Sequence, residues 1–108
     1  MIYKDTFKCF GFFKGLPYGN CNESMDDYRR TDCLLSRAAV IGHFESLDAA
    51  YTSAPTKDIN TGEIFPAGLY DDGEFLFTTD FVRYYMQGKV DIPREYEEYL
   101  IKTISNIN

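Results

Sequence analysis

The clearest pattern of apolar and polar positions lies in residues 67–77, where two short apolar runs flank an Asp-Gly pair. Asp-Gly between two such runs is a strong signal for a tight turn between antiparallel strands, so this segment predicts a β-hairpin. A hairpin alone is only marginally stable in water, which implies a third strand. We predict that strand over residues 47–53, although their propensity is also compatible with a helix.

Two helices are predicted after the hairpin. Residues 78–80, Thr-Thr-Asp, offer capping side chains to a helix over 81–86, and Gly88 ends that helix. Ile92-Pro93 opens the second helix, over 94–102. The residues expected to face the sheet recur at spacings of three and four: Tyr96, Tyr99, Leu100, Thr103 and Ile104. The positions expected to point outward are charged: Arg94, Glu95, Glu98 and Lys102.

The first half of the chain gives weaker patterns. Residues 6–14 fit either a strand or a short helix, and we predict the helix. Apolar residues at helical spacing predict one long helix, or two joined pieces, from residues 22–24 to residues 42–46. Residues 55–66 are polar and rich in turn formers, which predicts a loop. At about a dozen residues such a loop is long enough to be functional or mobile.

Together these elements predict an α+β fold: a small antiparallel β-sheet of about three strands with several packed α-helices. The 108 residues form one predicted domain, 1–108, large enough for a core without disulfides or metals. The chain has nine Phe, nine Tyr and no Trp. Most Phe should lie in the core, whereas some Tyr should be half-exposed, where their amphipathic rings suit interfaces.

Location follows from what the chain lacks. No run approaches the roughly 18 apolar residues that span a bilayer, and residues 1–5 do not resemble the start of a signal peptide. The odd number of cysteines, three, suits a reducing compartment. We therefore expect a cytoplasmic protein that does not bind membranes.

Charge is distributed unevenly along the chain, whose net charge is −6. Residues 1–22 carry a net charge of +2, whereas residues 71–98 carry eight acids against three bases, a net of −5. A negative field repels phosphate backbones and attracts basic proteins. Direct nucleic-acid binding is therefore disfavoured, and a basic protein partner is favoured.

Catalytic and metal sites are poorly supported. Cys9, Cys21 and Cys33 with His43 could supply four zinc ligands, but no two cysteines have the usual close spacing. On one helix Cys33 and His43 would be roughly 15 Å apart, beyond hydrogen-bond reach. Carboxylates at a hairpin tip lack the cleft that acid–base catalysis requires. We expect no catalytic residue, metal or cofactor.

A protein-binding surface fits the pattern better. Tyrosines within an acidic rim would suit a basic partner, because charge steers the encounter and aromatic rings hold the complex. The candidate partner-binding residues are Tyr70, Asp71, Asp72, Glu74, Tyr85, Asp91, Glu95 and Glu98.

Three segments carry a family resemblance: 68–77 (GLYDDGEFLF), 80–85 (DFVRYY) and 92–96 (IPREY). They resemble immunity proteins of contact-dependent growth inhibition, found in bacterial polymorphic-toxin systems. The resemblance is good over residues 68–96 and only in outline elsewhere. It implies an inhibitor of a cognate toxin, which we expect to be a basic nuclease. The alternatives are a small cytoplasmic regulatory or ligand-binding module, and a small enzyme that uses a carboxylate or His43.

Overall fold

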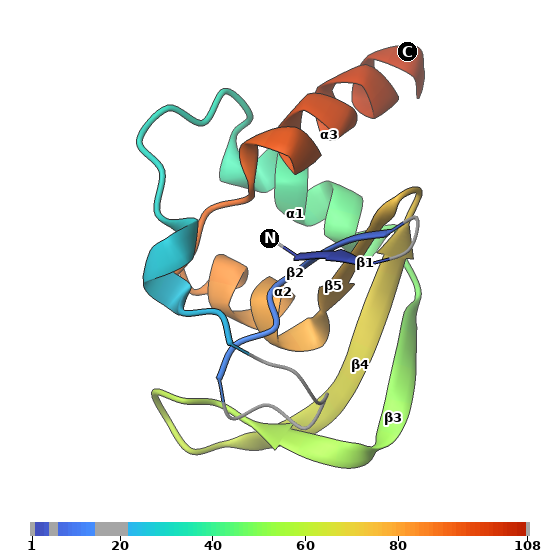
Figure 1. Ribbon diagram of the computed structural model, residues 1–108. Coiled ribbons are helices and arrows are strands. Elements are labelled where there is room, and N and C mark those ends of the chain that lie inside the picture. Colours follow the sequence, from blue (N-terminus) through green and yellow to red (C-terminus); the bar gives the residue numbers. More distant parts are fainter. Residues whose placement is uncertain (1, 5–6, 15–21, 108) are drawn as a thin grey trace.

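The computed structural model describes residues 2–4, 7–14 and 22–107, with the side chains of 2–4, 53–54 and 105–107 excepted. Figure 1 shows a sheet with helices packed against it. The elements in chain order are β1 (Ile2–Lys4), β2 (Phe7–Phe10), the 3₁₀-helix η1 (Met25–Tyr28), α1 (Arg37–Glu45), β3 (Ala49–Lys57), β4 (Ile64–Asp72), β5 (Phe75–Thr78), α2 (Thr79–Met86) and α3 (Arg94–Ile107).

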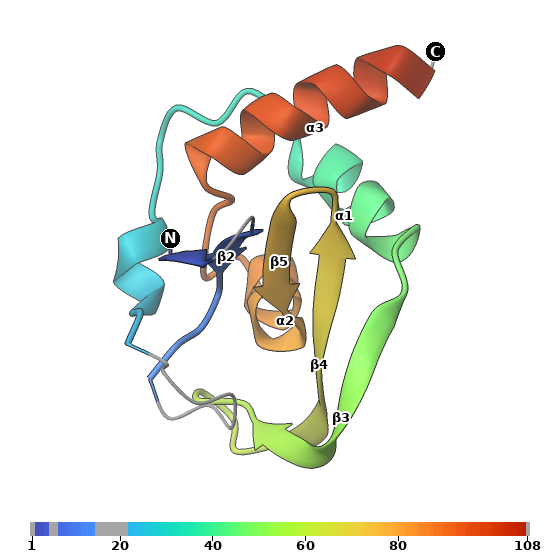
Figure 2. The same cartoon turned by 45° about the vertical axis from the view of Figure 1, so that its right-hand side comes forward.

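The α+β class is confirmed, but the sheet is larger than predicted and is mixed. Five strands lie in the order β1-β2-β5-β4-β3. The β2–β5 pair is parallel and the other three pairs are antiparallel. In Figures 1 and 2, β3 forms one outer rim of the sheet and α3 crosses above it.

The helix predicted over residues 6–14 is wrong, because residues 7–10 form β2. Phe10 is fully buried, and its ring stacks on that of Phe77 with centroids 4.8 Å apart. Gly11 follows with a φ of 82°, and an added Cβ there would lie 2.6 Å from Cβ of Phe81. The local sequence fits either a helix or a strand, and pairing with the distant strand β5 makes it a strand.

The loop predicted over residues 55–66 is also wrong. β3 continues to Lys57, and β4 begins at Ile64, so only a short turn separates two nine-residue strands. Buried Asp58 organises this turn, because its Oδ1 accepts the N–H groups of Asn60 and Thr61 at 2.7 and 3.0 Å. Its Oδ2 accepts from Nε of Arg83 at 2.7 Å, which fastens the turn to α2.

The helical stretch predicted from residues 22–24 to 42–46 consists of two pieces. Ser24 caps η1 and Ser36 caps α1, and residues 29–36 between them are irregular. The other expected elements are confirmed: a strand at residues 49–53, a hairpin turning at Gly73, and two helices. Thr78 caps α2, as its sequence position suggested.

The core is aromatic and lies between the sheet and the helices. Each α-helix contributes a ring that contacts Phe10 or Phe77 of the sheet: Phe44 of α1, Phe81 of α2 and Tyr96 of α3. The buried aromatic residues are Phe10, Phe13, Tyr28, Phe44, Phe75, Phe77, Phe81, Tyr84, Tyr85 and Tyr96. No helix among the described residues is long and apolar enough to cross a membrane.

Candidate protein-binding surface

Asp72 anchors the tip of the β4–β5 hairpin to two helices. Its Oδ2 lies 2.9 Å from Nε2 of His43 in α1 and accepts the Tyr96 hydroxyl of α3 at 2.7 Å. Its Oδ1 accepts the Tyr99 hydroxyl at 3.1 Å. The Asp72 carboxylate is buried, so these three contacts replace water around it.

The electrostatics of this cluster keep the tyrosine hydroxyls protonated. Burial and the nearby charge of Asp72 raise the pKa of Tyr96 well above its ordinary value. The same two causes raise the pKa of Tyr99. Both hydroxyls therefore serve as hydrogen-bond donors to the carboxylate, and the hairpin tip is held rigidly against α3.

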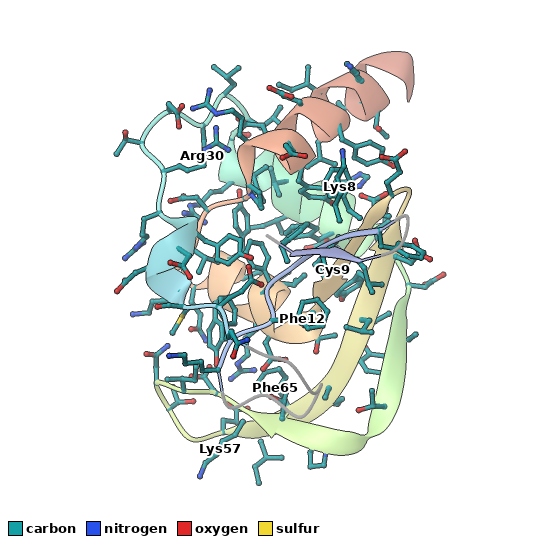
Figure 3. All side chains as sticks on the ribbon, in the orientation of Figure 1. Lys8, Cys9, Phe12, Arg30, Lys57 and Phe65 are labelled. Carbon is teal, nitrogen blue, oxygen red and sulfur yellow. The ribbon has the colours of Figure 1, made fainter. Side chains whose placement is uncertain are left out.

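Four acidic residues belong to the elements that meet at this anchor, and we call them together the acidic tip: Asp71 and Glu74 of the hairpin, and Glu95 and Glu98 of α3. Asp71 alternates with Asp72 along β4, so its side chain lies on the opposite face of the sheet. Lys8, labelled in Figure 3, lies 3.7 Å from Glu74 and 3.4 Å from Glu95, measured from Nζ to carboxylate oxygen. Asp71 and Glu98 are exposed, and within the described part of the chain neither forms an ion pair. Lys8 thus faces two of the four carboxylates, and the four acids with this lysine carry a net negative charge.

Tyr70 precedes Asp71 of the acidic tip in β4, and it is half-buried. Its ring stacks on Phe77 with a centroid distance of 5.4 Å. Burial and the neighbouring Tyr51 raise its pKa. Tyr51 is 64% exposed, and sequence analysis did not single it out. Only its pairing with Gly68 across the sheet brings it beside Tyr70.

The other predicted partner-binding residues lie elsewhere or inside. Tyr85 is buried, and the guanidinium of Arg37 stacks over its ring at 4.5 Å. Arg37 also donates to Asp91 at 2.7 Å, so these residues join α1 to the segment after α2. Burial raises the pKa of Tyr85 to about 12. Asp72 and Tyr85 are therefore absent from the surface, and Asp91 is separated from the acidic tip.

Glu97 is a buried carboxylate that sequence analysis missed. Its Oε2 accepts the N–H groups of Leu34 and Leu35 at 2.9 and 3.1 Å, and Arg30 donates to its Oε1 at 3.1 Å. Glu97 fixes the irregular residues 29–36 to the start of α3. Its spacing of three residues from Leu100 places it at the border of the apolar stripe, which is the signal that could have revealed it.

The environment of His43 was also not predicted. Sequence analysis considered His43 with Cys33, whereas the structure pairs it with Asp72 across 29 residues, a separation that no local pattern reports. Among the described residues, no cysteine or serine side chain hydrogen-bonds to the imidazole. Cys9 is buried and Cys33 exposed, Cys21 lies outside the described residues, and no metal-binding group occurs in the described part of the chain.

A hollow of about 250 Å³ lies away from the acidic tip. Its lining residues are Phe13, Lys14, Glu23, Ser24, Met25, Asp26 and Ile59. Glu23 at its base already accepts from the backbone N–H of Phe12 and from the Tyr28 hydroxyl. A ligand here would thus meet a carboxylate whose two oxygens are both occupied.

The acidic tip is a negatively charged group of carboxylates on elements joined through Asp72, which suits contact with a positively charged protein. Comparisons of this chain with protein-family models, with curated proteins and with solved structures give no match.

Proposed function

We propose that this chain is an immunity protein that binds and neutralises a cognate toxin domain in the cytoplasm. The partner is a basic protein, and a nuclease is the class whose own substrate requires a positive surface. The observation that carries the proposal is the acidic tip: several carboxylates, one facing lysine, and a buried anchor at Asp72 that holds them in place. The resemblance of residues 68–96 to immunity proteins agrees with it.

Preorganisation strengthens this proposal. A surface held in one conformation loses less entropy on binding than a mobile one. The contacts of Asp72 with α1 and α3 restrict the hairpin tip before any partner arrives. The acidic tip can then present a fixed pattern of charge, which speeds the encounter with a basic protein and selects against acidic ones.

A charge-reversal experiment tests the role of the acidic tip. The Asp71→Lys variant should associate with the toxin several-fold more slowly than the unaltered chain, and its association rate should depend less on salt. Adding Glu74→Lys should enlarge both effects. The matched control is Asp26→Lys, an equal charge change at an exposed residue of η1. Equal association rates for the Asp71 and Asp26 variants would remove the acidic tip from the interface.

The hollow beside Glu23 supports a second candidate, a ligand-binding module. Its lining combines apolar Phe13, Met25 and Ile59 with Lys14 and other polar residues, so it could take a small organic molecule with an anionic group near Lys14. A thermal-shift screen with metabolites tests this candidate, and a Met25→Trp variant that fills the hollow should abolish any shift. A basic protein partner remains the better-supported function, because the described contacts already use both oxygens of Glu23.

A further inference from the structure

β3 presents an open edge next to the acidic tip. Its inner side pairs with β4, through Ala49 with Tyr70, Ala50 with Leu69 and Tyr51 with Gly68. β3 stands last in the strand order, so no described strand pairs with its outer side. Figures 1 and 2 both show β3 at the outer rim of the molecule. Along an antiparallel edge strand, alternate residues direct their N–H and C=O groups outward, where another strand can pair with them.

The two halves of β3 differ in how well their sequence prevents pairing with a further strand. Proteins commonly guard an edge strand with proline, lysine or a β-bulge. The far half of β3 has all three, since Pro55 and Lys57 follow an irregularity in the register after Tyr51. The near half, Ala49–Tyr51, has no proline or charge, and two of its three side chains are methyl groups. This near half is what we call the open edge.

The side chains around the open edge differ between the two faces of the sheet. Tyr51 and Tyr70 share one face, because Tyr51 pairs with Gly68, two residues before Tyr70. Gly68 leaves room for the tyrosine ring, since an added Cβ would lie 3.1 Å from Cδ1 of Tyr51. On the opposite face, Asp71 follows Tyr70 in β4, and Asp48 directly precedes Ala49, the residue that pairs with Tyr70. Both carboxylates are exposed, so two negative charges flank this end of the β3–β4 pair.

We propose that the open edge of β3 accepts an extended segment of the toxin as an added strand, in which basic side chains alternate with apolar ones. The basic side chains would meet Asp48 and Asp71 on one face, and the apolar ones would pack on Tyr51 on the other. This inference rests on the proposed function and specifies its mode of binding. Hydrogen bonds to the backbone of the open edge supply affinity. The alternation of basic and apolar side chains in the added strand supplies specificity.

Charge argues against a second copy of the chain as the occupant. Pairing of two open edges would bring together two chains that each carry a net charge of −6, with exposed Asp48 and Asp71 near each edge. Repulsion between such like-charged surfaces opposes this pairing. A segment with lysine or arginine at alternate positions instead supplies a cation to Asp48 and Asp71, neither of which forms an ion pair with a described residue.

The test compares two substitutions that each add one lysine to an exposed strand position. Tyr51→Lys alters the open edge, whereas Ile64→Lys alters β4 where it pairs with Lys57 of the far half of β3. The two native side chains are 64% and 68% exposed. The probe is the toxin domain that co-purifies with this chain, and the readout is its Kd. Tyr51→Lys should weaken binding at least tenfold, because it removes the apolar contact and adds a like charge opposite the basic segment. Ile64→Lys should change the Kd less than twofold.

Hydrogen exchange gives a second readout that does not depend on a substitution. The amides of residues 49–51 that face outward should exchange at least tenfold more slowly in the complex than in the free chain. The toxin could bind and be inhibited without this protection, with equal Kd values for both lysine variants. That result would contradict strand addition at the open edge but leave the proposed function intact. Protection that appears on raising the concentration of the chain alone would identify a second copy as the occupant and overturn the inference. Recovery of no basic partner would overturn both.

Discussion

The carboxylate of Asp72 and the imidazole of His43 are 2.9 Å apart, joining the tip of the β4–β5 hairpin to α1. Two tyrosine hydroxyls from α3 complete the same cluster. Three elements that are separate in the sequence thus converge on one buried carboxylate directly beside exposed Asp71. This buried cluster supports the hairpin tip from inside, and its residues can be substituted separately from the exposed carboxylates.

Replacing Asp72 by Asn should lower the free energy of unfolding by about 1.5–3 kcal/mol, because the tyrosine hydroxyls lose a charged acceptor in a buried site. Urea unfolding measures this change. Asp71→Asn is the matched control, since its side chain points to the other face of the same strand and is exposed. It should change stability by less than about 0.5 kcal/mol. Equal effects of the two variants would mean that the cluster does not support the fold.

Glu97 and Glu98 are neighbours at the start of α3, but Glu97 is buried and Glu98 is exposed. Glu97→Gln should destabilise the protein by about 3 kcal/mol, because half-buried Arg30 loses its charged partner and two backbone donors lose a buried carboxylate. Glu98→Gln, at the next and exposed residue, should have an effect below about 0.5 kcal/mol. Thermal unfolding of both variants at the same pH distinguishes them. A Glu97 variant as stable as the Glu98 variant would contradict the assigned role.

The hairpin turn requires glycine at residue 73. Gly73 has a φ of 65°, and an added Cβ would lie 2.8 Å from the Tyr99 hydroxyl that Asp72 holds. Gly73→Ala should therefore cost about 1–2 kcal/mol for the backbone conformation alone. Gly42→Ala, in α1 with open space around it, should instead stabilise the chain by about 0.5–1 kcal/mol. Chemical denaturation of both variants should therefore give shifts of opposite sign.

Asp58 makes the stability of the β3–β4 hairpin sensitive to acid. The hydrogen bond from Arg83 holds the pKa of Asp58 well below its usual range, and Gln87 and two backbone N–H groups act in the same direction. A depressed folded-state pKa stabilises the native state above the unfolded value of about 4, and this contribution is lost as the pH falls below it. Asp58→Asn should show a smaller loss of stability between about pH 4 and pH 2 than the unaltered chain. An identical acid dependence would contradict the assignment.

Local signals predicted the C-terminal half well. Asp-Gly at the turn, Thr78 as a cap and the apolar spacing in α3 act within a few residues, and the structure has a hairpin and two helices there. Residues 7–10 and 55–66 were predicted wrongly because distant partners decide their conformation. β2 pairs with β5, more than sixty residues away, and Asp58 holds its turn through Arg83.

The candidate surface could be predicted only in part, for a related reason. Composition reveals which segments are acidic, but it does not reveal which carboxylates are buried. Asp71 and Asp72 are adjacent in the sequence and point to opposite faces of β4, and Glu97 and Glu98 differ in the same way on α3. Alternation along a strand could have separated the first pair, had the register of β4 been known.

The central claim is that this chain neutralises a basic toxin, and the most direct measurement is growth. The basic protein that co-purifies with the tagged chain from its native host at low salt would be produced in a test strain, with and without this chain. The proposed function predicts that the partner alone stops growth, that co-production of the chain restores it, and that Asp71→Lys with Glu74→Lys reduces the rescue. A partner that leaves growth unaffected, or whose toxicity persists beside the unaltered chain, would contradict it.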